Sequence, residues 1–342
     1  MQQRRAFLDY LKFIAMFLVV VYHTPPRYDK AQEAALFNLG APVFFFAAGY
    51  LFNIARQRVF WAFVKHRARQ LLVPYTTFFI VFYLLWLLVG RRMAGPDEMA
   101  IDTLKPVWQF VEGTPDVVLG TFWFIAALFT MQVIYWPIAW VSARVKLPWL
   151  PLLAALLLSL SLFVLPDVPW LRCWNIDKAL LYLPLYAVGN AVGNRCRGSE
   201  VKSPSPANWL LRLVAAAVGL SFLIYAPLNM RPDVAYVLAP EAVLLCLPLC
   251  VGVCRWLERR CGASRVAQVV AVTGITYLAV QNYIIGVIKI AAERVMGAGA
   301  LDDKVWLKVV IAAVVMAIIY PIALFVERRM PWMLGKGYKK SR

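Results

Sequence analysis

Lys12-Phe-Ile-Ala-Met-Phe-Leu-Val-Val-Val-Tyr-His23 is the stretch that decides the fold, because ten uncharged residues separate a cation from an imidazole. Extended to residues 8–25, it has the length of a membrane-spanning helix. At about 100° per residue, Lys12 and His23 share one helix face about 16 Å apart along the axis, and Asp9 lies on that face too. Ionisable side chains are costly inside a membrane, so this face is the first candidate for a functional site.

The rest of the chain has the same apolar character. Of its 342 residues, 62% are hydrophobic and only 16% are charged, and the mean hydropathy is +0.67. One soluble core cannot bury so much apolar surface. Apolar runs predict about ten transmembrane helices, near residues 8–25, 36–55, 71–90, 118–142, 148–165, 178–194, 208–229, 237–256, 267–290 and 305–326. We therefore expect an all-α polytopic membrane protein that forms a single integral-membrane domain over residues 1–342.

The charges are divided unequally between the two sides that these helices define. One side, which includes both chain ends, carries 22 Lys and Arg against 3 acidic residues, whereas the opposite loops carry 12 against 14. The positive-inside rule makes the basic side cytoplasmic, so both termini are expected there. Topology thus accounts for the net charge of +18, and we expect membrane lipids rather than nucleic acid as the surroundings. The six cysteines show no metal-site spacing, and no metal is predicted.

A basic segment, Lys65-His-Arg-Ala-Arg69, stands at the predicted cytoplasmic edge of the third apolar run. Arginine binds phosphate through two parallel hydrogen bonds, so Lys65, Arg67 and Arg69 are candidates for an anionic ligand with several phosphates. Ordinary positive-inside charge, or contact with lipid headgroups, explains the same pattern.

Two apolar segments carry recognisable local patterns. The first is Val43-Phe-Phe-Phe-Ala-Ala-Gly-Tyr-Leu-Phe52, in which Gly49 can allow a close approach between helices. The second is Phe122-Trp-Phe-Ile-Ala-Ala-Leu-Phe129. Taken alone, each predicts only a packed helix.

Taken together and in this order, the segments resemble the membrane-bound acyltransferase 3 family of glycan and antibiotic O-acyltransferases. The matching residues are Asp9-Tyr-Leu-Lys12 with His23, Phe44 to Leu51, Arg67-Ala-Arg69 ahead of Pro74-Tyr75, and Trp123-Phe124 with Ala127-Leu128-Phe129. The departures are a Lys at 12 for the usual Arg, an Ala at 48 for the usual Ser, and an Arg67 to Arg69 spacing of two residues instead of three. In addition, Gln281 and Asn282 stand where many members carry a late histidine.

The resemblance implies transfer of an acyl group, most often acetyl, from cytoplasmic acyl-CoA to a hydroxyl of a glycan or lipid-linked glycan in a bacterial inner membrane. It implies that His23 acts as general base or carries the acyl group transiently, and we prefer the base. Arg67 and Arg69, with Lys65, would bind the CoA phosphates. Lys12 would neutralise charge or position the donor, and Asp9 either assists it or forms a structural ion pair with it.

The main alternative is a carrier or flippase that exports a glycan or small anion without acyl chemistry, using the same intramembrane charges. Carriers often contain paired halves with broken helices at matching positions, and the sequence shows no convincing internal repeat. A carrier needs no acyl-CoA, whereas the transferase requires His23 and an acyl donor.

Overall fold

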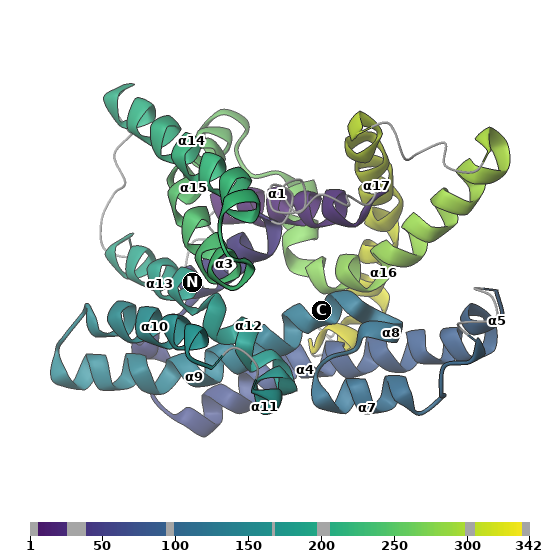
Figure 1. Cartoon of the computed structure of the whole chain (residues 1–342), viewed down its shortest axis with the longest axis horizontal. Helices are drawn as coiled ribbons and strands as arrows, with labels where there is room; N and C mark the ends of the chain where they lie inside the picture. Colours follow the sequence, from purple (N-terminus) through teal and green to yellow (C-terminus); the bar gives the residue numbers. More distant parts are fainter. Residues whose placement is uncertain are drawn as a thin grey trace, which may run out of the picture. The chain divides into compact units, whose positions relative to one another are not determined.

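The computed structural model describes residues 6–25, 39–93, 99–165, 168–196, 206–297 and 305–336, and within these ranges it is helical with no strand (Figure 1). Among these described residues, seven helices are long and apolar enough to cross a membrane, by length and composition: Ala6–His23, Phe60–Gly90, Asp116–Val145, Asn208–Ala226, Val234–Cys261, Arg265–Val295 and Trp306–Arg329. The prediction of an all-α, multi-pass membrane protein is confirmed.

Three of the ten predicted spans are shorter helices. They are α3 (Gly40–Leu51), α10 (Leu150–Leu160) continued by η4 (Ser161–Phe163), and the pair α12 (Ile176–Leu181) and α13 (Leu183–Cys196). Residues 36–38 of the second predicted span lie outside the described residues. Ten spans and cytoplasmic termini therefore stay predictions.

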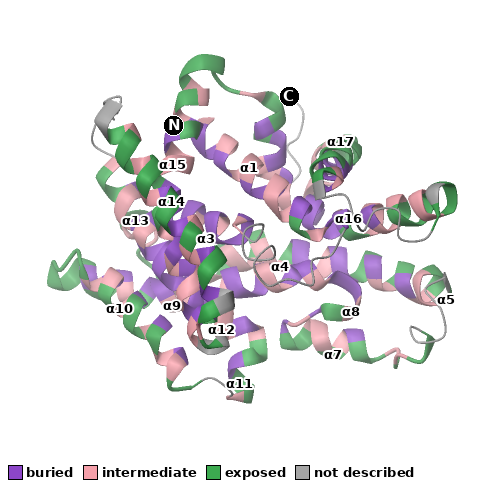
Figure 2. Ribbon diagram, turned by 45° about the horizontal axis from the view of Figure 1, so that its top comes forward, coloured by how far each residue is buried: buried purple, intermediate pink, exposed green. Residues whose placement is uncertain are grey.

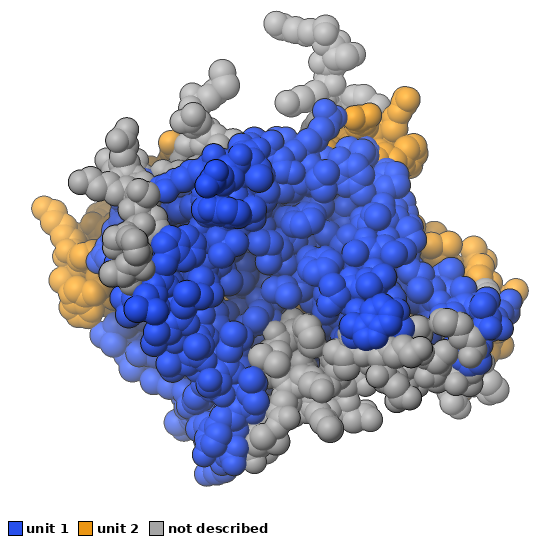
Figure 3. Space-filling view, turned by 90° about the horizontal axis from the view of Figure 1, so that it is seen from above, with its two compact units in different colours: residues 1–53, 152–164, 181–324 blue, residues 54–151, 165–180, 325–342 orange. Residues whose placement is uncertain are grey.

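The chain divides into two compact units (Figure 3). Unit 1 consists of residues 1–53, 152–164 and 181–324, and unit 2 consists of residues 54–151, 165–180 and 325–342. The chain passes from one unit to the other several times, so neither unit is a continuous stretch of sequence. A single domain over the whole chain stays a prediction.

Unit 1 is built around α1 (Ala6–His23), which packs against α3, α15 (Pro232–Cys261) and α16 (Arg265–Met296) (Figure 1). Helix α13 packs on α3, and α14 (Pro206–Asn229) packs on α15. Most of α17 (Val305–Arg329) also belongs to this unit. Figure 2 shows that the buried residues of α1 alternate with half-buried ones along its length.

Helices α3 and α13 approach each other through glycines. A Cβ added at Gly49 would overlap the backbone of Tyr186, and one added at Gly189 or Gly193 would overlap the backbone carbonyls of α3. Gly189 and Gly193 form a Gly-x-x-x-Gly pattern, which lets two helix backbones touch. The close approach expected at Gly49 is thus present, and α13 supplies the other half of it.

Unit 2 is centred on α4 (Phe60–Leu85) and α9 (Trp123–Val145). Its remaining elements are η1 (Ile54–Arg56), η2 (Trp86–Gly90), α5 (Arg91–Met93), α7 (Lys105–Glu112), α8 (Asp116–Leu119), η3 (Gly120–Phe122), α11 (Pro169–Arg172), η5 (Cys173–Asn175), most of α12 and η6 (Pro331–Leu334). The ring of Phe110 in α7 stacks on Phe79 and Tyr75 of α4, with centroids 4.2 and 4.8 Å apart. The long connector after α4 is therefore folded back onto that helix.

Candidate functional site

The first turn of α1 is fixed to the end of α15. The backbone amide of Phe7, which has no partner within its own helix, donates to a carboxylate oxygen of Glu258 at 3.2 Å. The hydroxyl of Tyr10 donates to the carbonyl of Gly262 at 3.1 Å, and the guanidinium of Arg255 lies 5.0 Å from the Phe7 ring centroid. These contacts set the position of α1 along its own axis.

The other end of α1 is fixed to α17 by a buried lysine. Lys308 is 0% exposed, and its ammonium donates to the carbonyl oxygen of Thr24 at 2.5 Å. The hydroxyl of Thr24 donates to the carbonyl of Val21 at 2.8 Å and contacts the carbonyl of Lys308 at 3.4 Å. A fully buried cation is costly, which makes Lys308 a functional candidate. It is joined directly to the residue that follows His23.

The three predicted residues of α1 lie on a regular helix, as expected. Asp9, Lys12 and His23 are all half-buried, and the ring of Tyr22 meets the His23 ring edge-on with centroids 5.1 Å apart. His23 is the last residue of the helix. Their shared face is therefore set by the helix itself, while their chemical roles stay predictions.

The basic segment lies inside α4, which begins at Phe60 rather than at the predicted start of the apolar run. In a helix, Lys65 and Arg69 are four residues apart and share a face, where both are exposed. Arg67 lies about 160° away from Arg69, and its guanidinium donates to the side-chain oxygen of Gln70 at 2.9 Å. The helix thus places Lys65 and Arg69 on one face and directs Arg67 to nearly the opposite face of α4.

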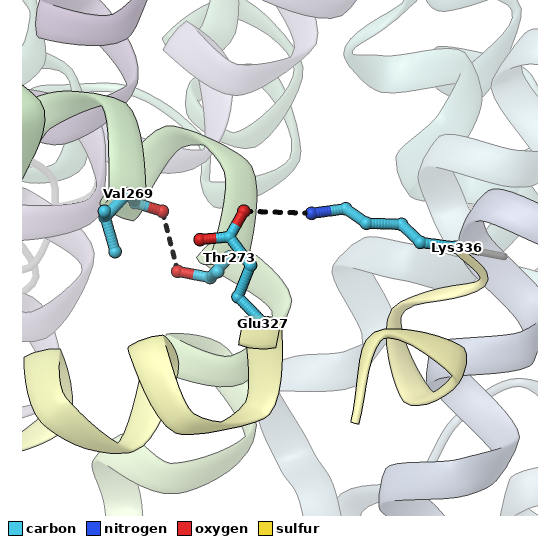
Figure 4. Close-up of polar contacts among 4 residues, drawn as sticks. All are labelled: Val269, Thr273, Glu327 and Lys336. Atoms are coloured by element: carbon cyan, nitrogen blue, oxygen red, sulfur yellow. Dashed lines mark hydrogen bonds and ion pairs between the residues drawn. The ribbon is translucent and has the colours of Figure 1, made fainter. Parts of the chain in front are cut away.

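The chain's C-terminal turn packs against the same part of α4. Gly335 has φ +66°, and a Cβ there would overlap the carbonyl of Arg69. The hydroxyl of Thr77 donates to the carbonyl of Met333 at 3.1 Å. Lys336 pairs with Glu327 at 3.4 Å, as Figure 4 shows. Sequence reasoning missed this contact, and its only local signal is the glycine that permits the turn.

The segment that contains Trp123 carries a polar cluster at its start. The ammonium of Lys178 lies 4.6 Å from the Trp123 ring centroid and donates to the side-chain oxygen of Asn175 at 2.9 Å. The Asn175 amide donates to the carbonyl of Gly113 at 2.6 Å. Trp174 and Asn175 have φ of +53° and +49°, which is unusual for residues other than glycine. A strained turn therefore holds Lys178 against the tryptophan.

Lys308 is the functional candidate that the sequence analysis did not single out. Its signal in the sequence is that of a cation inside the apolar run 305–326. Among the described residues, no group of three or more metal-ligating side chains could hold a metal ion.

The comparison with protein families gives a match over most of the chain. The model of the acyltransferase 3 family, described as an acyltransferase domain, matches residues 5–328, which is nearly the whole chain. None of the curated proteins and none of the solved structures matches it. The family match runs through α1, α3, α4 and α9, the helices that carry the quoted motifs, and the fold around them is that of a multi-pass membrane protein. The chain therefore belongs to the acyltransferase 3 family and is a membrane acyltransferase.

Proposed function

We propose that this protein transfers an acetyl group from cytoplasmic acetyl-CoA to a hydroxyl of a glycan or lipid-linked glycan, with His23 as general base. The observation that supports it best is the fixing of α1 at both ends, by Glu258 and Gly262 at one end and by Lys308 at the other. A base must be held in place to act on a hydroxyl, and rigid placement is a large part of what an enzyme contributes to the rate.

In this proposal the acceptor hydroxyl loses its proton to the imidazole of His23 as its oxygen attacks the thioester carbonyl. The C–S bond breaks, an oxygen ester forms, and the CoA thiolate leaves and takes up the proton. In the second form of the same reaction, His23 first takes up the acyl group as a covalent intermediate and then passes it to the acceptor hydroxyl. Lys12 lies about 16 Å from His23 along the helix, so it would act on the donor's position rather than on the reacting atoms. Asp9 would hold Lys12 in place.

The donor's phosphates would bind at the exposed face of α4. Lys65 and Arg69 present two cations on one side of the helix, which suits a polyphosphate group at the cytoplasmic edge of the membrane. Arg67 projects from another side, so we assign it a weaker, separate contact with the same donor. The organism's inner membrane is the proposed location, because the positive side of the chain faces the compartment that supplies acyl-CoA.

The test is acetyl transfer in isolated membranes. Membranes with the wild-type protein or with His23→Ala, at matched protein levels, receive acetyl-labelled acetyl-CoA, and label is followed into the glycan and lipid fractions. We expect label with the wild-type protein and at least a 100-fold lower rate without the imidazole, in line with the contribution of general base catalysis.

Two results would count against the proposal. Equal labelling by both proteins removes His23 from the chemistry. Absence of labelling and of acetyl-CoA consumption in both, across glycan acceptors, favours the carrier, which needs no donor.

A further inference from the structure

Two arginines of unit 1 lie close together where α14 packs on α15. The side chain of Arg212, in the second turn of α14, reaches α15, because a Cβ added at Gly252 would lie 2.5 Å from its Nη1 atom. Arg255 follows Gly252 by one turn, and residues three apart on a helix are neighbours. The charge of Arg255 is close enough to act on that of Arg212. The packing of these two helices therefore brings two guanidinium groups together.

Neither guanidinium group forms an ion pair with an acidic residue within the described part of the chain. Arg212 lies against the ring of Trp209, 5.5 Å from its centroid. Arg255 lies 5.0 Å from the Phe7 ring centroid and meets the Cys196 sulfur at 3.8 Å. Each arginine carries five N–H donors in the plane of its guanidinium, and contacts with ring faces leave most of them available. Because like charges repel at short range, the pair favours an anion between its members.

The helices around the pair supply little negative charge to balance it. Helices α13 and α14 contain no acidic residue. On α15 the acid nearest in sequence to the pair is Glu258, and it already accepts the backbone amide of Phe7 at 3.2 Å. Helix α1 contributes one acid and one cation, Asp9 and Lys12, and α15 adds the exposed Arg260. The surroundings thus leave a net positive charge at this point.

Four helix ends of unit 1 meet at the pair: the start of α1, the end of α13, the start of α14 and the end of α15. The predicted topology places all four on the basic, cytoplasmic side. Arg212 lies only four residues, about 6 Å, inside the apolar helix that starts at Asn208. In that topology the two guanidinium groups are at the depth of lipid headgroups.

The surface next to the pair is apolar and exposed. Helix α14 is the least buried of the seven helices that could cross a membrane, since only 22% of its apolar stretch is buried. Leu210, Leu211 and Leu213 are each more than half exposed, and on α15 Val253 and Trp256 are exposed as well. Tryptophan is common at headgroup depth. A soluble anion would leave this apolar surface uncovered, whereas the acyl chains of a lipid would cover it.

We propose that Arg212 and Arg255 bind the phosphate group of an anionic phospholipid, whose acyl chains lie along the exposed face of α14. A phosphodiester has two non-ester oxygens that share one negative charge, and each can accept hydrogen bonds from one guanidinium. An anionic headgroup brings no cation of its own, so its charge reduces the repulsion between the arginines. The site uses residues of unit 1 alone, and it does not depend on the chemistry of His23.

The test is lipid binding to the purified, full-length protein in detergent. Phosphatidylglycerol with brominated acyl chains quenches the fluorescence of tryptophans that it contacts, so a titration gives its affinity. Arg212→Gln removes one charge of the pair, and Arg212→Lys keeps the charge but loses the planar fork. Arg260→Gln is the matched control, because it removes an exposed charge near the same end of α15, about 140° around the helix from Arg255.

We expect Arg212→Gln to weaken phosphatidylglycerol binding about 10- to 100-fold, in line with the loss of hydrogen bonds between charged groups. Arg212→Lys should lose less. Arg260→Gln should lose no more than about 5-fold, the effect of one charge near a membrane surface. Phosphatidylcholine with the same chains should bind weakly to all four proteins, because its headgroup carries its own cation.

Thermal unfolding separates loss of binding from loss of the fold. Without added lipid, Arg212→Gln should unfold at the wild-type temperature or higher, because the repulsion within the pair is gone. Added phosphatidylglycerol should raise the unfolding midpoint of the wild-type protein and of Arg260→Gln, since a ligand of the native state stabilises it, and should raise that of Arg212→Gln much less.

Three results would overturn the inference. Equal losses in Arg212→Gln and Arg260→Gln would show that only the general positive charge attracts the lipid. Equal affinity for phosphatidylglycerol and phosphatidylcholine would assign the binding to the acyl chains alone. Displacement of the brominated lipid by inorganic phosphate or by coenzyme A would assign the two arginines to a soluble phosphate ligand.

Discussion

At the scale of single residues, Lys308 has unusual surroundings, since its fully buried ammonium is bonded to a main-chain carbonyl next to His23. Removing the charge has two opposing effects on stability. A hydrogen bond from a charged donor contributes about 1.5–3 kcal/mol, whereas burying a cation costs several kcal/mol, so an apolar replacement can be nearly neutral. The effect of removing the charge should therefore appear mainly in the placement of His23 and less in the stability of the fold.

We therefore predict that Lys308→Met lowers kcat about 10- to 100-fold while leaving the KM for the acyl donor unchanged. Small displacements of a catalytic group reduce rates by this order. The measurement is steady-state acetyl transfer by purified protein. Lys289→Met is the control, because Lys289 is exposed and only pairs with Glu293 on its own helix, at 3.6 Å. Wild-type kcat in Lys308→Met would show that the bond to Thr24 plays no part in the reaction.

How far the sequence predicts the site differs from residue to residue. The common face of Asp9, Lys12 and His23 follows from helix periodicity alone, and the structure has that helix. The hydrogen bond between Lys308 and Thr24 joins residues 284 apart in the chain and uses a main-chain acceptor. No pattern of side chains in the sequence therefore predicts it.

At the scale of elements, the contact between α3 and α13 depends on glycines that have no room for a side chain. We predict that Gly189→Ala and Gly193→Ala lower the thermal unfolding midpoint in detergent. Crowding against a backbone carbonyl costs about 1–3 kcal/mol, which exceeds the roughly 0.5–1 kcal/mol by which Ala favours a helix over Gly.

Gly286→Ala in α16 is the matched control for both variants. Nothing lies within 4 Å of a Cβ at that position, so the same substitution should raise the midpoint. Tryptophan fluorescence follows the unfolding of all three variants. A midpoint raised equally at Gly189 and Gly286 would mean that α3 and α13 are not in backbone contact.

Helix boundaries were harder to predict than the helices themselves, and α4 shows why. Apolar character identifies only residues 71–90, whereas the helix begins at Phe60 and includes the whole basic segment. Charged residues such as Lys65 and Arg69 are good helix formers, so a span can continue past the apolar run into polar surroundings. The consequence for the site is direct, because helical geometry separates Arg67 from its two basic neighbours.

At the scale of the whole molecule, the proposed reaction depends on which side of the membrane each end of the helices faces. Hydropathy and the charge bias predict ten spans with a cytoplasmic basic side, and the all-helical fold agrees with the membrane class. The orientation is set by charges in loops and by the membrane itself. The packing between helices does not show which side faces the cytoplasm, so the orientation has to be measured.

Two native cysteines allow that measurement. Cys173 and Cys261 are both exposed, and the predicted topology places them on opposite sides, with Cys173 outside and Cys261 at the cytoplasmic end of α15. In variants that keep only one of the two, a membrane-impermeant maleimide added to right-side-out vesicles should label Cys173 and leave Cys261 unlabelled. In inverted vesicles the result should reverse, and detergent should make both cysteines reactive, which controls for exposure.

Labelling of Cys261 from outside would invert the predicted topology, and the cations Lys65 and Arg69 would then face away from cytoplasmic acetyl-CoA. The donor site on α4 would have to be abandoned, although the fixed position of His23 on α1 would remain.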